Sequence, residues 1–213
     1  MNYKVDHIPR NTPCNRRPGI AMMPKYLTIH STGNPNSTAK GERAWLTDNP
    51  QNKATASYHI VVDENEAIEV LPLNEVAWHA GDGNGPGNRS SIGIEICESG
   101  NRQKTLANAV KLVAKMLKER GWGLDKLRRH YDWSGKICPR ILQPNNWQGW
   151  KEFKSAMEKE LGGNKVKVNI KGKVYLLDGF MKDGTNYVPI RAIAEALGHK
   201  VSWDNTAEAV VIK

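Results

Sequence analysis

The chain has 213 residues, which is enough for one domain of ordinary size and a smaller second one. It is 39% apolar and 25% charged, which excludes a wholly disordered chain, and no apolar run approaches the roughly 20 residues that a membrane span needs. A net charge of +9 favours anionic partners, but the basic residues are spread along the chain without a run of five like charges, so we expect no nucleic-acid partner.

The first 25 residues contain no apolar run behind a basic start, so we expect no signal peptide and no membrane partner. We expect this segment, which contains His7 and a Pro- and Arg-rich stretch around Cys14, to be loosely structured. Cys14, Cys97 and Cys138 are odd in number and irregularly spaced, so they predict no disulfide framework. Each cysteine is therefore interpreted as a core residue, a metal ligand or a nucleophile.

Alternating apolar and polar residues predict several strands in the first part of the chain, at 26–30, 57–63, 67–71 and 91–97. Residues 105–120 predict an amphipathic helix, with apolar residues at steps of three and four and Gly121 as its stop signal. Strands that alternate with helices predict an α/β fold, with a mixed central sheet flanked by helices.

A second helix is predicted up to Leu161, followed by a glycine-containing joint at 162–164. After the joint the pattern predicts more strands and one short helix: strands at 165–170, 173–177, 200–203 and 209–212, and a helix at 191–197. We therefore predict a domain of residues 1–161, a linker of residues 162–164, and a smaller α+β domain of residues 165–213.

Two separate segments contain residues typical of metal ligands. His30 is at the end of the first strand, beside a polar turn that contains Gly33, and His130 and Cys138 are eight residues apart in a later loop. Two imidazoles and one thiolate form a ligand set of two nitrogens and one sulfur, and three protein ligands with an open fourth position are typical of catalytic zinc. Many loops contain a His and a Cys, so these residues alone leave the zinc site as one interpretation among others.

Glu95 occupies the middle of a β-branched strand. Ile92, Ile94 and Ile96 alternate to one face, which places Glu95 on the other face with Cys97. A carboxylate in such a strand has a partner or a function when it is buried. A glutamate on the solvent face of an edge strand is the open alternative.

Five segments together resemble the type-2 N-acetylmuramoyl-L-alanine amidases, a family shared with phage lysins and peptidoglycan recognition proteins. They read HSTGN at 30–34, SYHIV at 57–61, AWHAG at 77–81, IGIE at 92–95 and KICP at 136–139, in the order of the family. The resemblance extends from about Tyr26 to Pro139. It implies a zinc hydrolase that cleaves the amide bond between N-acetylmuramic acid and L-alanine in bacterial peptidoglycan.

The resemblance also implies roles for individual residues. His30, His130 and Cys138 would be the zinc ligands, and some members of the family have Asp in place of the Cys. Glu95 would act as general base for the attacking water, and Lys136 would stabilise the oxyanion.

Three further residues match segments of the family that lie near the metal. Tyr58 corresponds to a tyrosine whose catalytic role varies between members, and His79 and Asn34 are expected to bind substrate along the groove. From the strand pattern alone, His59 is expected to be a core residue or to lie behind the metal ligands, and Cys97 to be a core residue.

The tail resembles the small stalk domain named after the N-terminal domain of copper amine oxidases, through residues 179–181, 187–198 and 201–204. It contains one histidine, His199, and no cysteine, so we expect no copper site. A wall-binding module and a folding or dimerisation appendage are both open. The whole chain is expected to be a phage or prophage endolysin, made in the host cytoplasm and active on the Gram-positive wall after release. The alternative is a non-catalytic peptidoglycan-binding protein of the same fold.

Overall fold

The structure is a computed structural model that describes residues 1–48, 51, 53–162, 165–182, 185–207 and 209–213. Backbone contacts divide the chain into two units, Met1–Met157 and Glu158–Lys213. Gly163 and Asn164 of the predicted linker lie outside the described residues, so the exact domain boundary stays a prediction.

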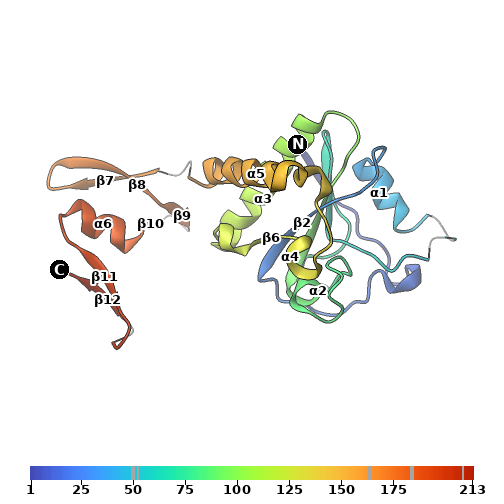
Figure 1. Cartoon of the computed structure of the whole chain (residues 1–213), viewed down its shortest axis with the longest axis horizontal. Coiled ribbons are helices and arrows are strands. Elements are labelled where there is room, and N and C mark those ends of the chain that lie inside the picture. Colours follow the sequence, from blue (N-terminus) through green and yellow to red (C-terminus); the bar gives the residue numbers. More distant parts are fainter. Residues whose placement is uncertain (49–50, 52, 163–164, 183–184, 208) are drawn as a thin grey trace. The chain divides into compact units, whose positions relative to one another are not determined.

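The larger unit is built on a six-stranded mixed sheet in the order β1-β4-β3-β5-β2-β6 (Figure 1). The central strands β3, β5, β2 and β6 run parallel to one another, β4 is antiparallel to β3, and β1 is parallel to β4. This arrangement confirms the predicted mixed sheet. The strands are β1 Asn2–Val5, β2 Tyr26–Ser31, β3 Ile60–Val62, β4 Glu66–Glu69, β5 Ser91–Ile96 and β6 Leu127–Arg129.

Helices cover both faces of this sheet. In Figure 1, α3 and α5 lie on one side of it and α1 lies on the other; α3 packs against β3 and β5, and α1 against β3 and β4. Side chains of both faces of β2 and β5 are therefore buried, polar ones included. No helix in the described part of the chain is long and apolar enough to cross a membrane. The helices are α1 Ala39–Trp45, α2 Pro86–Ser90, α3 Arg102–Arg120, α4 Tyr131–Ser134 and α5 Pro144–Gly162.

The N-terminal segment is ordered, so the expectation of a loose segment is wrong. Strand β1 pairs in parallel with β4 at the edge of the sheet, in the register Asn2↔Glu66 to Val5↔Glu69. The Glu69 carboxylate accepts hydrogen bonds from the Tyr3 hydroxyl and from His7 Nε2, the latter at 2.8 Å. Without β1, the edge of β4 would leave backbone donors and acceptors unpaired, and β1 pairs with these groups. A strand of four residues is too short for its sequence pattern to predict this pairing.

Two arginines anchor the rest of the N-terminal segment. Arg16 is 1% exposed and donates hydrogen bonds to two backbone carbonyls. Arg17 donates to both carboxylate oxygens of Glu75, at 2.9 and 3.0 Å, and to the carbonyl of Ile8 at 2.6 Å. The two side chains of this ion pair are 14% and 11% exposed, so solvent screens the charges only partly.

Replacing Glu75 by glutamine is expected to lower the free energy of unfolding by about 2 kcal/mol at pH 7, because it breaks charged hydrogen bonds of a largely buried arginine. Hydrogen bonds from Arg17 lower the pKa of Glu75. Its contribution is therefore complete above the unfolded carboxyl pKa, about 4.3, and is lost as the pH falls through the lower folded value. The measurement is urea unfolding at pH 7 and at pH 3. The difference in the free energy of unfolding between Glu75→Gln and the unsubstituted chain should be smaller at pH 3. An equal difference at both pH values would contradict this assignment.

After the end of α5, the described residues of the smaller unit form one helix and three two-stranded antiparallel sheets, which confirms the predicted α+β class. Within its described residues Ala194 is the buried apolar side chain, while Trp203 and Leu176 are more than half exposed. So small a unit buries little apolar surface. Its elements are β7 Lys165–Ile170, β8 Lys173–Asp178, β9 Phe180–Lys182, β10 Thr185–Tyr187, α6 Ile190–Ala196, β11 Val201–Asp204 and β12 Ala209–Ile212.

Candidate metal centre and active site

The parallel strands bring three of the predicted site residues together towards the carboxyl ends of β2, β5 and β6. His30 on β2 and Glu95 on β5 are direct neighbours in the strand register. His130 follows β6 directly, and its backbone N–H donates to the Ile29 carbonyl at 3.2 Å. Residues 100 positions apart in the chain therefore meet because β6 and β5 flank β2 on either side.

The three predicted metal ligands converge on one point. His30, His130 and Cys138 are 1%, 6% and 5% exposed, and their ligand atoms lie within 4.8 Å of one another. His30 Nδ1 is 3.0 Å from His130 Nδ1 and 3.7 Å from Cys138 Sγ. Zinc bonds of about 2.1 Å to nitrogen and about 2.3 Å to sulfur in tetrahedral geometry place such atoms about 3.4–3.6 Å apart, so the spacing suits this ion.

The hydrogen bonds of the imidazoles fit a cation at this point. His79 Nε2 faces the Ser91 carbonyl at 3.1 Å, and His79 Nδ1 faces His30 Nε2 at 3.0 Å. A carbonyl only accepts, so His79 carries its proton on Nε2 and accepts one from His30. His130 donates to the Ala80 carbonyl. The two Nδ1 lone pairs of His30 and His130 therefore point at each other, and a cation held by both nitrogens would remove that repulsion.

Burial keeps the imidazoles in the neutral state that a metal needs and keeps the thiol protonated. Burial lowers the pKa of His30 well below its usual value, that of His130 to about 4 and that of His79 to about 3. The imidazoles are therefore neutral and have lone pairs. Burial raises the pKa of the Cys138 thiol to about 12, so this thiol needs a nearby cation to lose its proton.

An ion pair that the sequence did not reveal holds the loop of Cys138. Arg140, two residues after the cysteine, donates from Nε and from its terminal nitrogen to the Glu98 carboxylate at 3.0 and 2.6 Å. The Arg140 backbone N–H donates to the Ser31 hydroxyl, and Glu98 also accepts from the Gly33 N–H. The loop is thus tied to the end of β2, beside His30. No periodic pattern marks these residues, because their partners are distant in sequence.

Glu95 lies beside the three candidate ligand residues, and one of its oxygens has no hydrogen-bond partner among the described residues. Its Oε1 is 3.9 Å from His30 Nδ1, and its Oε2 is buried without a hydrogen-bond partner among the described residues. Burial, together with the nearby carboxylate of Glu42, raises the pKa of Glu95 to about 8, although Lys136 opposes the shift. Glu95 is therefore not the solvent-exposed edge residue that the sequence left open, because β5 is an inner strand.

A cavity of about 290 Å³ opens over this cluster, and every predicted site residue lines it. Asn34 lies on its exposed side, and the Tyr58 hydroxyl donates to the backbone carbonyl and carboxylate of Glu42, at 2.8 and 3.3 Å. Glu42 on α1 was missed, since a seven-residue helix gives no clear periodicity. The lining comprises His30, Ser31, Thr32, Asn34, Glu42, Trp45, Ala56, Ser57, Tyr58, His79, Glu95, His130, Lys136 and Cys138.

A second cavity of about 640 Å³ adjoins the first. The two share Ala56, His79, His130 and Lys136 in their linings. All three candidate ligand residues line the first hollow, and His130 also lines the second, so the second hollow opens beside the ligand residues.

The predictions for Cys97 and His59 concern residues outside the candidate ligand set. Cys97 is fully buried in a core cluster with residues such as Leu46 and Val61. This placement confirms that Cys97 is a core residue. His59 is also fully buried, accepting from the Gly93 N–H and donating to the Glu75 carbonyl.

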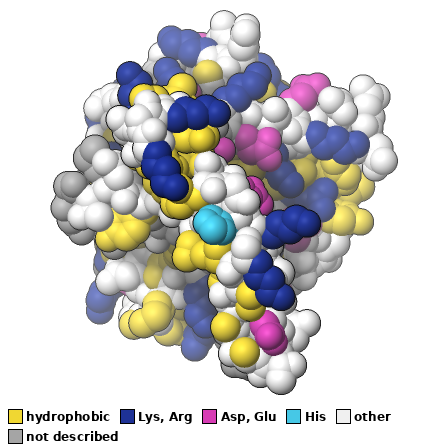
Figure 2. Space-filling view, turned by 90° about the vertical axis from the view of Figure 1, so that its left-hand side faces the viewer, with side chains coloured by type: hydrophobic (Ala, Val, Ile, Leu, Met, Phe, Trp, Pro, Cys, Tyr) yellow, Lys and Arg dark blue, Asp and Glu magenta, His cyan; other side chains and the backbone are white. Residues whose placement is uncertain are grey.

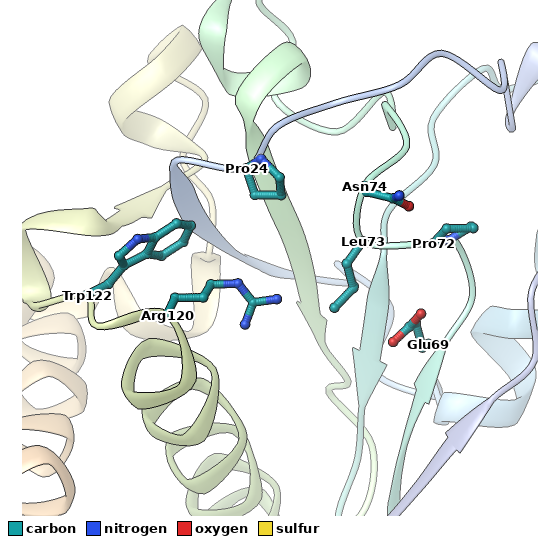
Figure 3. Close-up of a pocket in the computed structure, with 7 residues that line it drawn as sticks. All are labelled: Pro24, Glu69, Pro72, Leu73, Asn74, Arg120 and Trp122. Atoms are coloured by element: carbon teal, nitrogen blue, oxygen red, sulfur yellow. The ribbon is translucent and has the colours of Figure 1, made fainter. Parts of the chain in front are cut away.

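A third hollow, of about 560 Å³, is separate from this cluster (Figure 3). Arg120, the last residue of α3, and Trp122, just beyond it, face Leu73 and Pro72 of the loop after β4 across this hollow. None of the predicted site residues lines it.

On the face drawn in Figure 2, lysine and arginine side chains are interspersed with apolar and acidic groups.

Comparison with known proteins agrees with this geometry. Residues 20–141 match the family described as N-acetylmuramoyl-L-alanine amidase, and residues 163–213 match the copper amine oxidase N-terminal domain. The amidase XlyB of Bacillus subtilis (strain 168) is 49% identical over 149 residues, which are 67% of this chain and 45% of that protein. The amidase XlyA of the same organism is 37% identical over 220 residues, covering all of this chain and 66% of that protein.

Solved structures give the same picture for the larger unit. The catalytic domain of XlyA has 43% sequence identity and a TM-score of 0.66, and the match covers 74% of this chain and 99% of that one. PlyL has 34% identity and a TM-score of 0.66, covering 77% and 99%. The chain spans between 45% and 66% of the length of the first three curated relatives. Since the amidase match covers more than half of its residues, this chain belongs to the N-acetylmuramoyl-L-alanine amidase family.

Proposed function

We propose that the chain is a zinc-dependent hydrolase of the amide bond between N-acetylmuramic acid and L-alanine in peptidoglycan, and that it acts as a phage or prophage endolysin. The convergence of His30, His130 and Cys138 beside Glu95 carries this proposal. The names of the relatives add support, since XlyA and XlyB are N-acetylmuramoyl-L-alanine amidases and a similar solved chain is an endolysin from Bacillus subtilis.

The metal would be held by Nδ1 of His30, Nδ1 of His130 and Sγ of Cys138, the three atoms that face one another. Bound zinc supplies Lewis acidity, which polarises a carbonyl and lowers the pKa of water to about 7.

Glu95 is the proposed general base. Its Oε2, which has no partner among the described residues, accepts a proton from the attacking water while the water oxygen bonds to the carbonyl carbon of the scissile amide. The same carboxyl group then gives this proton to the alanine nitrogen as the carbon–nitrogen bond breaks. Burial raises the pKa of Glu95 to about 8, so its protonated form can donate a proton near neutral pH. A cation at the neighbouring site would lower this pKa and favour the carboxylate that accepts the proton.

Lys136 and Tyr58 are proposed to support this chemistry. The Lys136 ammonium lines the cavity and would stabilise the negative charge that develops on the carbonyl oxygen. The Tyr58 hydroxyl is turned towards Glu42, so we propose that Tyr58 acts by holding that carboxylate, whose charge in turn acts on Glu95.

The substrate is proposed to lie across both cavities. The glycan strand and the stem peptide flank the scissile amide, and two adjoining hollows open at the candidate ligand residues, with His130 in the lining of both. Asn34, on the exposed side of the first cavity, is the proposed substrate contact, and His79 lines the inner wall.

Mass spectrometry of purified Gram-positive sacculi digested by the chain tests the reaction. The expected products are free L-alanine amino termini without new reducing sugars, and a zinc chelator should abolish them. New reducing ends would identify a glycosidase and contradict the proposal. Binding to walls without any product would favour the alternative of a non-catalytic peptidoglycan-binding protein.

We propose that residues 165–213 form a wall-binding module, in keeping with their match to a stalk domain. Removing them is then expected to reduce the fraction of protein that pellets with purified walls, while a soluble muropeptide is still cleaved at an undiminished rate. Pelleting equal to that of the full chain would leave the tail as a folding or dimerisation appendage.

A further inference from the structure

The His79 ring lies behind the candidate ligand His30, at the inner wall of the cavity. His79 is 7% exposed, and its ring contacts the His30 ring edge-on, with centroids 5.0 Å apart and planes at 90°. Both of its nitrogens are engaged, Nδ1 with His30 Nε2 at 3.0 Å and Nε2 with the Ser91 carbonyl at 3.1 Å.

The fold makes room for this ring and fixes its backbone. A Cβ atom at position 93 would come within 2.7 Å of the His79 ring, so Gly93 on β5 leaves the space that the imidazole fills. The Asn88 side-chain oxygen accepts hydrogen bonds from the backbone N–H groups of His79 and Ala80, both at 2.8 Å. A side chain that only lines a cavity does not need both its ring and its backbone held in this way.

We propose that His79 is a positioning residue for the metal centre, which holds His30 in the tautomer and ring orientation that direct Nδ1 to the metal. The Ser91 carbonyl can only accept, so it keeps the His79 proton on Nε2 and leaves Nδ1 as an acceptor. His79 Nδ1 in turn takes the Nε2–H of His30, and the free lone pair of His30 is then on Nδ1. This role rests on the proposed zinc chemistry, and differs from the substrate contact expected from the sequence.

A matched pair of substitutions separates the acceptor from the shape of the side chain. Asparagine can place an oxygen near the position of His79 Nδ1, whereas leucine has the same branching but no acceptor. We expect His79→Leu to bind zinc about 10–100-fold more weakly than the unsubstituted chain, and His79→Asn to retain most of the affinity. The measurement is competition with a chromophoric chelator, after circular dichroism has shown that both metal-free variants are folded.

The tautomer of His30 provides a readout without metal. Long-range proton–nitrogen NMR correlations of the metal-free chain should show the His30 proton on Nε2, and His79→Leu should lose this single state. Zinc affinities that are equal in the two variants, whether both retained or both weakened, would overturn the role of the acceptor. If the unsubstituted chain binds no zinc, the proposed function fails, and the His30 tautomer in the metal-free variants still decides the role of His79.

Discussion

Replacing Glu95 by glutamine is expected to lower the rate of L-alanine release from sacculi by about 10²–10⁴-fold, the usual contribution of a general base. Glutamine keeps the shape of the side chain but does not accept the proton from water. Zinc should remain bound, because Glu95 is not one of the three clustered ligand residues.

Glu119→Gln is the matched control, because Glu119 lies on α3 with its side chain 55% exposed and does not line either cavity of the site. Its rate should equal that of the unsubstituted chain. A Glu95→Gln chain that cleaves at the normal rate with zinc bound would show that another group takes the proton.

Replacing Cys138 by alanine is expected to weaken zinc binding by more than about 100-fold, since even the outer partners of a ligand are worth 10–100-fold. Cleavage of sacculi should be lost with the metal. Cys138→Asp should retain zinc and part of the activity, because a carboxylate is also a zinc ligand. Metal content after dialysis and the rate of L-alanine release measure both effects.

Cys97→Ala separates loss of a ligand from loss of any buried thiol. Cys97 is fully buried in the core cluster, so its replacement should lower the stability and leave the zinc content unchanged. Full zinc content in Cys138→Ala would contradict the ligand set.

The central strands were predictable because they combine strong local patterns with burial. The predicted strands at 26–30 and 91–97 correspond to β2 and β5, and the predicted helix at 105–120 corresponds to most of α3. The strand predicted at 57–63 is shorter in the structure, β3 Ile60–Val62. Strands β1, β6, β9 and β10, which have three or four residues each, were not predicted from the sequence pattern.

The ligand residues could be proposed from the sequence, but their supports could not. His30, His130 and Cys138 belong to recognisable segments, and the structure brings their ligand atoms together. Glu42 and the pair of Glu98 with Arg140 depend on tertiary neighbours that no local pattern encodes. The place of His79 behind His30 likewise depends on the space left by Gly93 in another strand.

The most direct test of a zinc amidase is to remove the metal and return it in measured amounts. Product analysis of sacculi should show no L-alanine release by the metal-free chain, and full release once one equivalent of zinc per chain has been added. Release at the full rate by a chain shown to contain no metal would contradict the account.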